Sequence, residues 1–152
     1  MKTATEFEHT LPNTGETYTY RVALVICART LAVSVEYPAE AEVDNLSASD
    51  AYPLAAIEAW VSRLLGFPVE SDGGWSCATC TGSIEEIWIL TACAGAIDLD
   101  LVHVTLLAGE AAAHGDFEQV ALCERAIDDE DVESAIECFR AIVEAHNAQD
   151  AA

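Results

Sequence analysis

The chain has 152 residues, of which 27 are acidic and 6 basic, so its formal net charge is −21. Direct binding to DNA, RNA or an anionic membrane is disfavoured, because phosphate contacts need clustered lysines and arginines. Hydrophobic residues make up 52% of the chain, which is enough for a buried core and argues against a disordered chain. We expect one domain over residues 1–152, with an α/β core in residues 1–97 and a mainly helical region in residues 98–148.

The first 37 residues show the alternation of apolar and polar side chains that is typical of strands. The alternation is weak from Thr5 to Leu11 and strongest from Thr17 to Cys27. Between them, Pro12–Gly15 predicts a turn, because proline fixes one dihedral angle and glycine tolerates a positive one. Residues Leu31–Tyr37 alternate again. Ala28 and Arg29 make a poor hairpin turn, so a bulge and a long bent strand both stay open.

The next segment predicts a loop followed by a helix. Pro38–Asp50 is polar and acidic and is expected to be a loop. A helix over Pro53–Leu65 is predicted by apolar residues at helical spacing and by the proline in its first turn. Ser49 and Asp50 are candidate caps for its start, and Gly66 is expected to end it.

The middle of the chain is less clearly patterned. Ser71–Gly82 contains several turn-forming residues, and Ile84–Cys93 predicts a strand that is buried on at least one face. Residues 98–113 fit both patterns: the alternation at the start indicates a strand, whereas the alanines after Gly109 favour a helix. Strand and helix both stay open for residues 98–108.

The C-terminal residues predict two antiparallel helices joined by an acidic connector. Asp116 and Gln119 form a capping box after Gly115. Apolar stripes follow in both helices, with these members: Phe117, Val120 and Ile127, then Val132, Ile136, Phe139 and Val143. Residues 149–152 are expected to fray. The predicted fold class is therefore α+β, with a small antiparallel sheet packed by one amphipathic helix and followed by a C-terminal helical hairpin.

Six cysteines invite a disulfide or a metal interpretation. The first residues contain acids and no apolar run, so we expect no secretory signal and free thiols in a reducing cytoplasm. No segment is apolar enough to predict a transmembrane helix. We expect no cofactor. Zinc is the alternative, with Cys77-x-x-Cys80 as a half-site and Cys93 and His103 as further ligands, although those two are too far apart for a standard second half-site.

Catalytic residues are not indicated. The sequence contains no phosphate loop, nucleophile elbow or His-Glu-x-x-His helix. His103-Val104-Thr105 is similar to the His-x-Thr pairs of two-histidine phosphoesterases, but no second pair is present. We expect no enzyme, and a small hydrolase is retained only as a second alternative.

Acidic residues are concentrated at the C-terminal end. Residues 110–152 hold 12 acids and 2 bases, so their charge density is more than twice that of the preceding 109 residues. Carboxylates on rigid helices can imitate nucleic-acid phosphates and occupy a basic groove. The alternatives are a solvated helix face, a high-GC genome and adaptation to high salt. The candidate partner-binding residues are Glu110, Asp116, Glu118, Glu124, Asp128, Asp129, Glu130, Asp131, Glu133 and Glu137.

The stretch from His114 to Ala126, HGDFEQVALCERA, resembles the closing helices of small proteins from phages and plasmids. Together with the size and charge, it is similar to small acidic anti-defence proteins of the anti-CRISPR and antirestriction type. This resemblance implies a cytoplasmic, non-enzymatic inhibitor, a DNA mimic that docks on a basic nucleic-acid-binding surface of a partner such as a bacterial defence complex. It carries over no individual functional residues.

Overall fold

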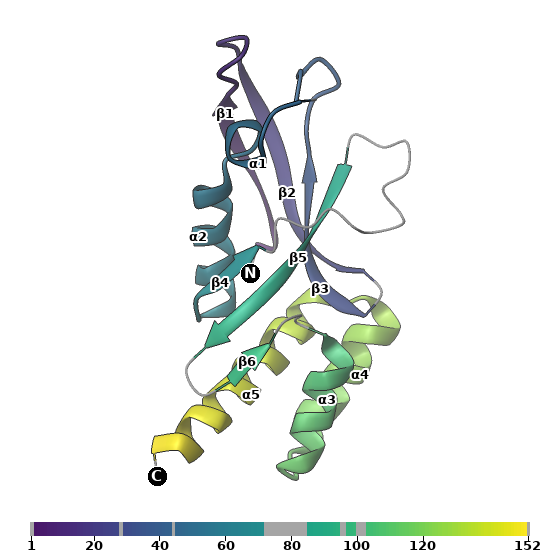
Figure 1. Cartoon of the computed structure of the whole chain (residues 1–152). Coiled ribbons are helices and arrows are strands. Elements are labelled where there is room, and N and C mark those ends of the chain that lie inside the picture. Colours follow the sequence, from purple (N-terminus) through teal and green to yellow (C-terminus); the bar gives the residue numbers. More distant parts are fainter. Residues whose placement is uncertain are drawn as a thin grey trace.

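The structure, a computed structural model, describes residues 2–27, 29–43, 45–71, 85–94, 97–99 and 103–151. Its strands form an antiparallel sheet in the order β1-β2-β3-β5-β4, and a short β6 also pairs with β5 (Figure 1). The strands are β1 (Ala4–Thr10), β2 (Thr17–Cys27), β3 (Thr30–Glu36), β4 (Val69–Ser71), β5 (Glu85–Ala94) and β6 (Ile97–Leu99). The predicted α+β class is confirmed, and the best predicted strand, β2, has the predicted bounds.

Two tight turns set the register of the first three strands. In the predicted turn before β2, Gly15 has a φ of 71° and its amide donates a 2.7 Å hydrogen bond to the carbonyl of Leu11. Between β2 and β3, Cys27 pairs directly with Thr30. Arg29 lies in the left-handed region with a φ of 64°, where residues other than glycine are uncommon. The chain therefore makes a hairpin at the point where the sequence pattern left a bulge or a bent strand open.

The described residues form five helices: α1 (Ala48–Ala51), α2 (Leu54–Leu65), α3 (Val104–Ala113), α4 (Phe117–Asp129) and α5 (Val132–Ala151). Helix α2 matches its prediction within one residue and ends at Gly66, whose φ is 81°. The predicted caps are wrong: Pro53 occupies the cap position and makes no side-chain cap hydrogen bond. Asp50 instead lies within α1, where its carboxylate accepts a hydrogen bond from Ser47.

Both patterns that competed over residues 98–113 are realised, on different residues. The strand pattern is realised in β6, which ends at Leu99, and the helix pattern in α3, which begins at Val104. The start of α3 is joined to the β2–β3 turn, since the Val104 amide donates a 2.8 Å hydrogen bond to the carbonyl of Arg29. At the other end of the chain, α5 continues as a helix to Ala151, past Gln149 where fraying is expected.

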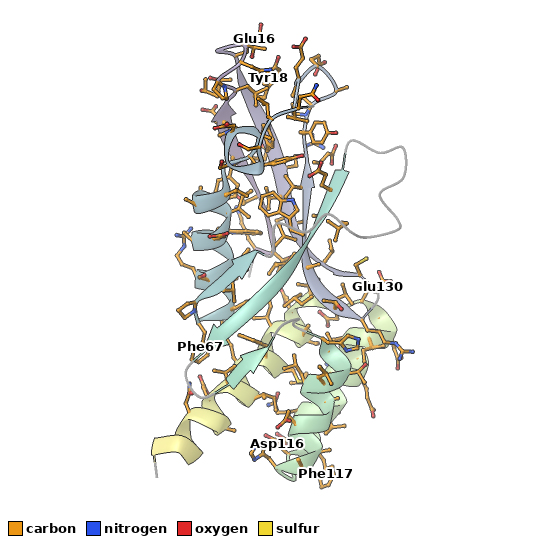
Figure 2. All side chains as sticks on the ribbon, in the orientation of Figure 1. Glu16, Tyr18, Phe67, Asp116, Phe117 and Glu130 are labelled. Carbon is orange, nitrogen blue, oxygen red and sulfur yellow. A yellow bond between two sulfur atoms is a disulfide. The ribbon has the colours of Figure 1, made fainter. Side chains whose placement is uncertain are left out.

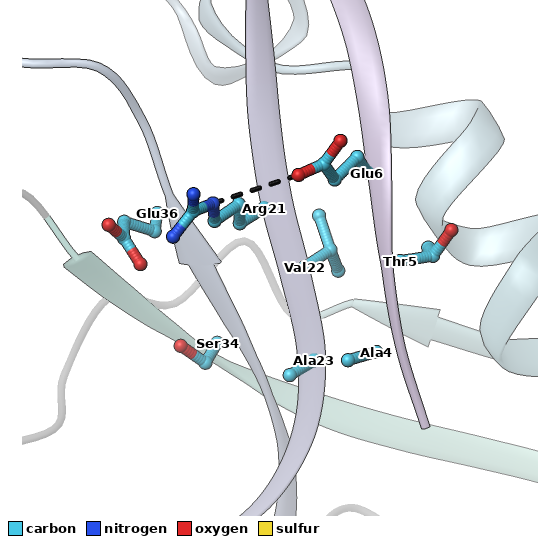
Figure 3. Close-up of a pocket in the computed structure, with 8 residues that line it drawn as sticks. All are labelled: Ala4, Thr5, Glu6, Arg21, Val22, Ala23, Ser34 and Glu36. Carbon is cyan, nitrogen blue, oxygen red and sulfur yellow. Dashed lines mark ion pairs between the residues drawn. The ribbon is translucent and has the colours of Figure 1, made fainter. Parts of the chain in front are cut away.

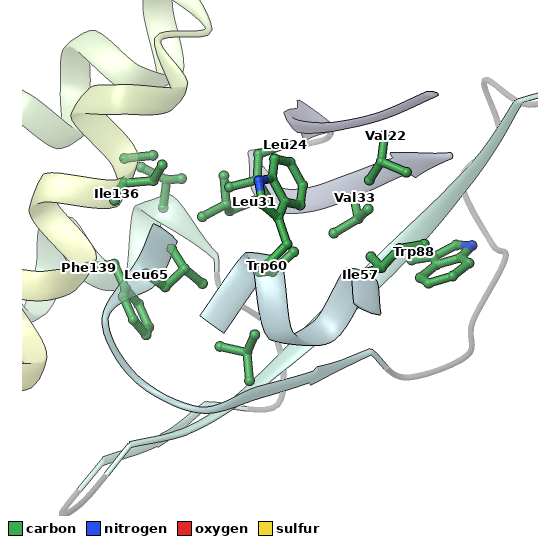
Figure 4. Close-up of a cluster of buried hydrophobic side chains, with 14 of the residues drawn as sticks. Val22, Leu24, Leu31, Val33, Ile57, Trp60, Leu65, Trp88, Ile136 and Phe139 are labelled. Atoms are coloured by element: carbon green, nitrogen blue, oxygen red, sulfur yellow. The ribbon is translucent and has the colours of Figure 1, made fainter. Parts of the chain in front are cut away.

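One hydrophobic cluster joins the sheet to all three C-terminal helices. Figure 4 shows Leu24 and Leu31 of the sheet beside Trp60 of α2, with Ile136 and Phe139 of α5 at the same cluster. Burial of this apolar surface is the main force that holds the layers together. The helices α3, α4 and α5 pack against one another below the end of the sheet (Figure 1).

A disulfide links α4 to α5 through Cys123 and Cys138, whose Cα atoms are 6.1 Å apart. Cys27 is disulfide-bonded as well. The expectation of free thiols is therefore wrong for these three cysteines. The two cysteines are 15 residues apart in the sequence, and this spacing does not indicate that they pair. The pairing depends on how the two helices pack. Among the described residues, no helix combines the length and the apolar character needed to cross a membrane.

Candidate acidic interaction surface

The structure places the ten predicted partner-binding acids on α3, α4 and α5, at the cap before α4 and on the α4–α5 connector. Glu110 and Asp131 are partly buried, and the other eight are exposed. We call these eight the acidic hairpin surface: Asp116, Glu118, Glu124, Asp128, Asp129, Glu130, Glu133 and Glu137. Figure 2 shows that Asp116 and Glu130 lie at opposite ends of α4, so the surface extends along the whole helix.

The exposed side of α4 follows from its residue spacing. Ala121, Glu124 and Asp128 lie at helical spacing on one exposed stripe, and Glu118 and Asp129 lie on the adjacent one. The opposite side is buried, where Cys123 and Ala126 contact the core. The carboxylates of α4 therefore project to solvent from a helix whose other side is fixed by packing and by a disulfide.

Helix α5 contributes a narrower acidic stripe. Most of its first 12 residues are buried, including Ile136, Phe139 and Val143. Glu133 and Glu137 lie one turn apart on the strip that remains exposed. The predicted apolar face of this helix is thus confirmed for its three fully buried members, and the two acids are held on a rigid element.

Two of the predicted acids are helix caps. The Asp116 carboxylate accepts a 3.3 Å hydrogen bond from the Gln119 amide, which is one half of the predicted capping box. The reciprocal half is not formed, because the Asp116 amide donates to the carbonyl of Ala111 and Gln119 Oε1 is buried without a partner among the described residues. Asp131 precedes α5 and accepts hydrogen bonds from Ser134, at 2.8 Å from the hydroxyl and 3.4 Å from the amide. The hydroxyl hydrogen bond is the main reason that the pKa of Asp131 is lowered, and Arg125 adds a smaller attraction. Asp131 therefore has a structural role that explains its presence.

Two pairs among the other acids have a spacing that costs stability. Glu124 and Asp128 are four residues apart on α4, and Glu133 and Glu137 are four apart on α5. Like charges at this spacing destabilise a helix by roughly 0.2–0.5 kcal/mol per pair. A solvated face selected only for stability would alternate acids with bases. Glu133 also lies in the first turn of α5, where a carboxylate interacts favourably with the helix dipole, so the cost of the spacing is least offset for Glu124 and Asp128.

The two arginines of the C-terminal region are used differently. Arg125 is exposed on α4, among the acids. The Arg140 guanidinium points inward and donates hydrogen bonds to the carbonyls of Leu64 and Leu65 at the end of α2, the latter at 3.3 Å. These carbonyls have no partner within their own helix, so Arg140 satisfies them. Arg140 thus ties α5 to α2 and does little to neutralise the surface.

Phe117, a predicted member of the apolar stripe on α4, points to solvent and not to the core. Phe117 is 73% exposed, whereas Val120 and Ile127 are partly buried against the core. Phe117 is the first residue of the helix, and Figure 2 shows it at the tip of the molecule beside Asp116. The spacing of apolar residues does not predict this exposure. Whether Phe117 is covered depends on where the neighbouring helix α3 ends, which the spacing does not show.

The zinc prediction lies mostly outside the described residues. Cys77 and Cys80 fall in residues 72–84, and only the backbone of Cys93 is described, in β5. His103 precedes α3, and its Nδ1 atom is buried without a hydrogen-bond partner among the described residues. No group of three or more potential metal ligands occurs within the described part of the chain. The zinc alternative remains a prediction.

The N-terminal histidine has a structural explanation. The Nε2 atom of His9 lies 2.8 Å from the carbonyl oxygen of Asp50, and its ring packs edge-on against Tyr20. His103 lies at the start of α3 and His114 at its end. These three histidines therefore lie apart, with His9 on β1 and the other two at opposite ends of α3.

A shallow hollow on the open face of the sheet was not predicted from the sequence. Figure 3 shows Arg21 between Glu6 and Glu36, above the small side chains of Ala23 and Ser34. Small residues on neighbouring strands leave a volume of about 400 Å³. The Arg21–Glu6 ion pair is 3.7 Å long and both side chains are well over half exposed, so it adds little to stability. The hollow is open to solvent, and we assign it no ligand.

Comparison with known proteins adds no relative: no family model matches the chain, and no curated protein or solved structure matches it significantly.

Proposed function

We propose that the protein is a non-enzymatic interaction protein, an acidic inhibitor that mimics nucleic acid and occludes a basic nucleic-acid-binding surface of a partner. A bacterial defence complex, of the CRISPR or restriction type, is the proposed class of target. The observation that carries this proposal is the acidic hairpin surface, with eight exposed carboxylates on two packed helices, on their connector and at the cap of α4.

The charge spacing on α4 supports mimicry. Four carboxylates lie between Glu118 and Asp129, a stretch that is about 16 Å long at 1.5 Å per residue. This is roughly one carboxylate per 4 Å, against about one phosphate per 3.4 Å along a DNA strand. The positive charge of Arg125 lowers the net density of negative charge along the helix. A groove that binds phosphates at this spacing would meet a similar row of negative charges.

The rigidity of the helical hairpin supports the same proposal. The disulfide joins α4 to α5, and Arg140 joins α5 to α2. Charges held in place lose less conformational entropy on binding than charges on a flexible tail. The proposed mechanism is therefore steric and electrostatic occlusion. The proposed location of the protein is the cytoplasm, where such targets act.

The test compares two variants with the same net charge. The first carries Glu124→Gln, Asp128→Asn and Asp129→Asn, and it spares Asp131 because that residue is a cap. The control carries Glu8→Gln, Glu40→Gln and Glu42→Gln, three exposed acids remote from the hairpin. Both variants change the formal net charge from −21 to −18.

Each variant is immobilised and exposed to a bacterial lysate at low and at high salt, and bound proteins are identified by mass spectrometry. The wild type and the control are expected to retain one stoichiometric nucleic-acid-binding protein that is released at high salt. The hairpin variant is expected to bind it roughly tenfold more weakly, because it removes attraction at the contact. Equal retention by both variants would show that general acidity, and not this surface, makes the contact.

A further inference from the structure

Phe117 exposes more of its side chain than any other large hydrophobic residue described. It is 73% exposed, and the next is Leu106 of α3 at 57%. Isolated exposed apolar residues are common on protein surfaces, so exposure alone decides nothing. What distinguishes Phe117 is its surroundings, because it has exposed carboxylates on both sides, at Asp116 and Glu118.

The geometry of α4 places Phe117 in line with the acids. Residues 117, 121, 124 and 128 recur at helical spacing, so Phe117 begins the exposed stripe that contains Glu124 and Asp128. With a rise of 1.5 Å per residue, these two carboxylates lie about 10 Å and about 16 Å along the helix from Phe117. One face of α4 therefore combines an aromatic side chain at its start with a row of negative charges.

The helix does not need Phe117 in order to begin. The first turn is capped by Asp116, whose carboxylate accepts the hydrogen bond from Gln119. The side of α4 that contacts the core is made by Cys123 and Ala126. An alanine at position 117 would leave both features in place, so the exposed ring has no evident structural function.

We propose that Phe117 is the apolar anchor of the acidic hairpin surface and inserts its ring into an apolar pocket bordered by arginines or lysines on a partner protein. This inference rests on the proposed function and adds the residue that fixes the position of the decoy on its target. Buried aromatic residues within a charged rim are typical energetic centres of protein interfaces. Charge steers the encounter, and the anchor determines how long the complex lasts.

Charge complementarity selects this occupant over two others. A second copy of the chain would bring another net charge of −21 to the same place, so self-association through Phe117 would be opposed by repulsion. A nucleic acid would be repelled by the same carboxylates. A basic protein surface with an apolar pocket can bury the ring and also attract the acids.

The test uses the protein captured at low salt in the experiment above, purified, as the binding probe. Phe117→Ala is compared with Leu106→Ala, a matched removal of an exposed apolar side chain from α3. Phe117→Ala is expected to raise Kd by about tenfold or more through faster dissociation, with unchanged salt dependence. Leu106→Ala is expected to stay within about twofold. Circular dichroism and thermal unfolding check that both variants keep the fold.

Other outcomes separate this inference from the proposed function. If Phe117→Ala binds like the wild type while the hairpin charge variant binds weakly, the decoy stands and the anchor is wrong. Equal losses in the Phe117 and Leu106 variants would replace the anchor by a diffuse apolar surface. A dimer in sedimentation experiments that Phe117→Ala abolishes would assign the ring to self-association and overturn the proposal. Failure to capture any salt-sensitive partner would overturn both proposals.

Discussion

Asp131 shows how a single acid in a negatively charged segment can have a structural role. It accepts two hydrogen bonds from Ser134 at the start of α5, and its pKa is lowered mainly for that reason. The ionised carboxylate is the better acceptor, and it also interacts favourably with the helix dipole. Among the acids of the connector, Asp131 is therefore distinguished by its geometry and not by its charge.

We predict that Asp131→Ala lowers the free energy of unfolding by about 1 kcal/mol at neutral pH, as is typical for loss of a cap. The pKa is lower in the folded state, so this stabilisation is present above the unfolded pKa and is lost as the pH falls through the folded pKa. Denaturation at pH 7 and in strong acid should thus show a difference that shrinks in acid. Asp129→Ala is the control, and an equal effect of both changes would contradict the capping role.

Arg140 gives a second prediction at this scale. Its guanidinium satisfies carbonyls at the end of α2, so Arg140→Met should leave them unsatisfied and cost about 1–3 kcal/mol. Arg125→Met removes the same charge from an exposed position and should cost much less. Denaturant titration of both variants measures the difference. Similar losses would mean that charge, and not the tie between α2 and α5, accounts for the effect.

At the scale of elements, the helical hairpin depends on the Cys123–Cys138 disulfide. A loop of about 15 residues loses about 3 kcal/mol of unfolded-state conformational freedom when it is closed by a disulfide, in the chain-entropy description. We predict a decrease of that order in unfolding free energy for the double variant Cys123→Ala, Cys138→Ala.

Denaturation without reductant compares this double variant with the wild type, and alkylation followed by mass measurement counts the thiols. The change leaves the surface acids in place. The free energy of partner binding should therefore decrease by less than the free energy of unfolding. A wild type with both thiols free after purification would contradict the disulfide. Disulfides are rare in reducing compartments. Alkylation at the moment of lysis therefore also tests the proposed cytoplasmic location, which a disulfide already formed in the cell would contradict.

The elements differ in how far the sequence pattern determines them. β2 and α2 are predicted within one residue, because each has a long apolar pattern of the correct period and a glycine at one end. The β2–β3 hairpin is not predicted, because Arg29 adopts a left-handed conformation that is typical of glycine or asparagine. For residues 98–113, local pattern alone does not separate the short strand from the helix that follows.

The site is predictable in part for the same physical reasons. Charged side chains avoid burial, so the exposure of the acids on α4 and α5 follows from composition. Three features depend on tertiary packing and have no local pattern: the outward direction of Phe117, the inward direction of Arg140 and the pairing of Cys123 with Cys138. The hollow beside Arg21 likewise requires small residues from neighbouring strands to meet.

At the scale of the whole molecule, the net charge of −21 is distributed unevenly. The N-terminal end has its own acids near the β1–β2 turn, where a hydrogen bond to Glu16 is the main cause that raises the pKa of Tyr18 to about 12. This region lies at the opposite end of the molecule from Phe117 (Figure 2). A decoy that acted by total charge would use both ends equally, whereas the proposed mechanism requires the helical hairpin.

The most direct measurement is therefore competition for a bound nucleic acid. A fluorescently labelled duplex is bound to the purified partner, and its anisotropy is followed as this protein is added. The wild type and the control variant, with Glu8, Glu40 and Glu42 neutralised, should displace the duplex. The variant with Glu124, Asp128 and Asp129 neutralised should need roughly tenfold more protein. A partner that retains its nucleic acid at saturating wild-type protein would contradict the decoy mechanism.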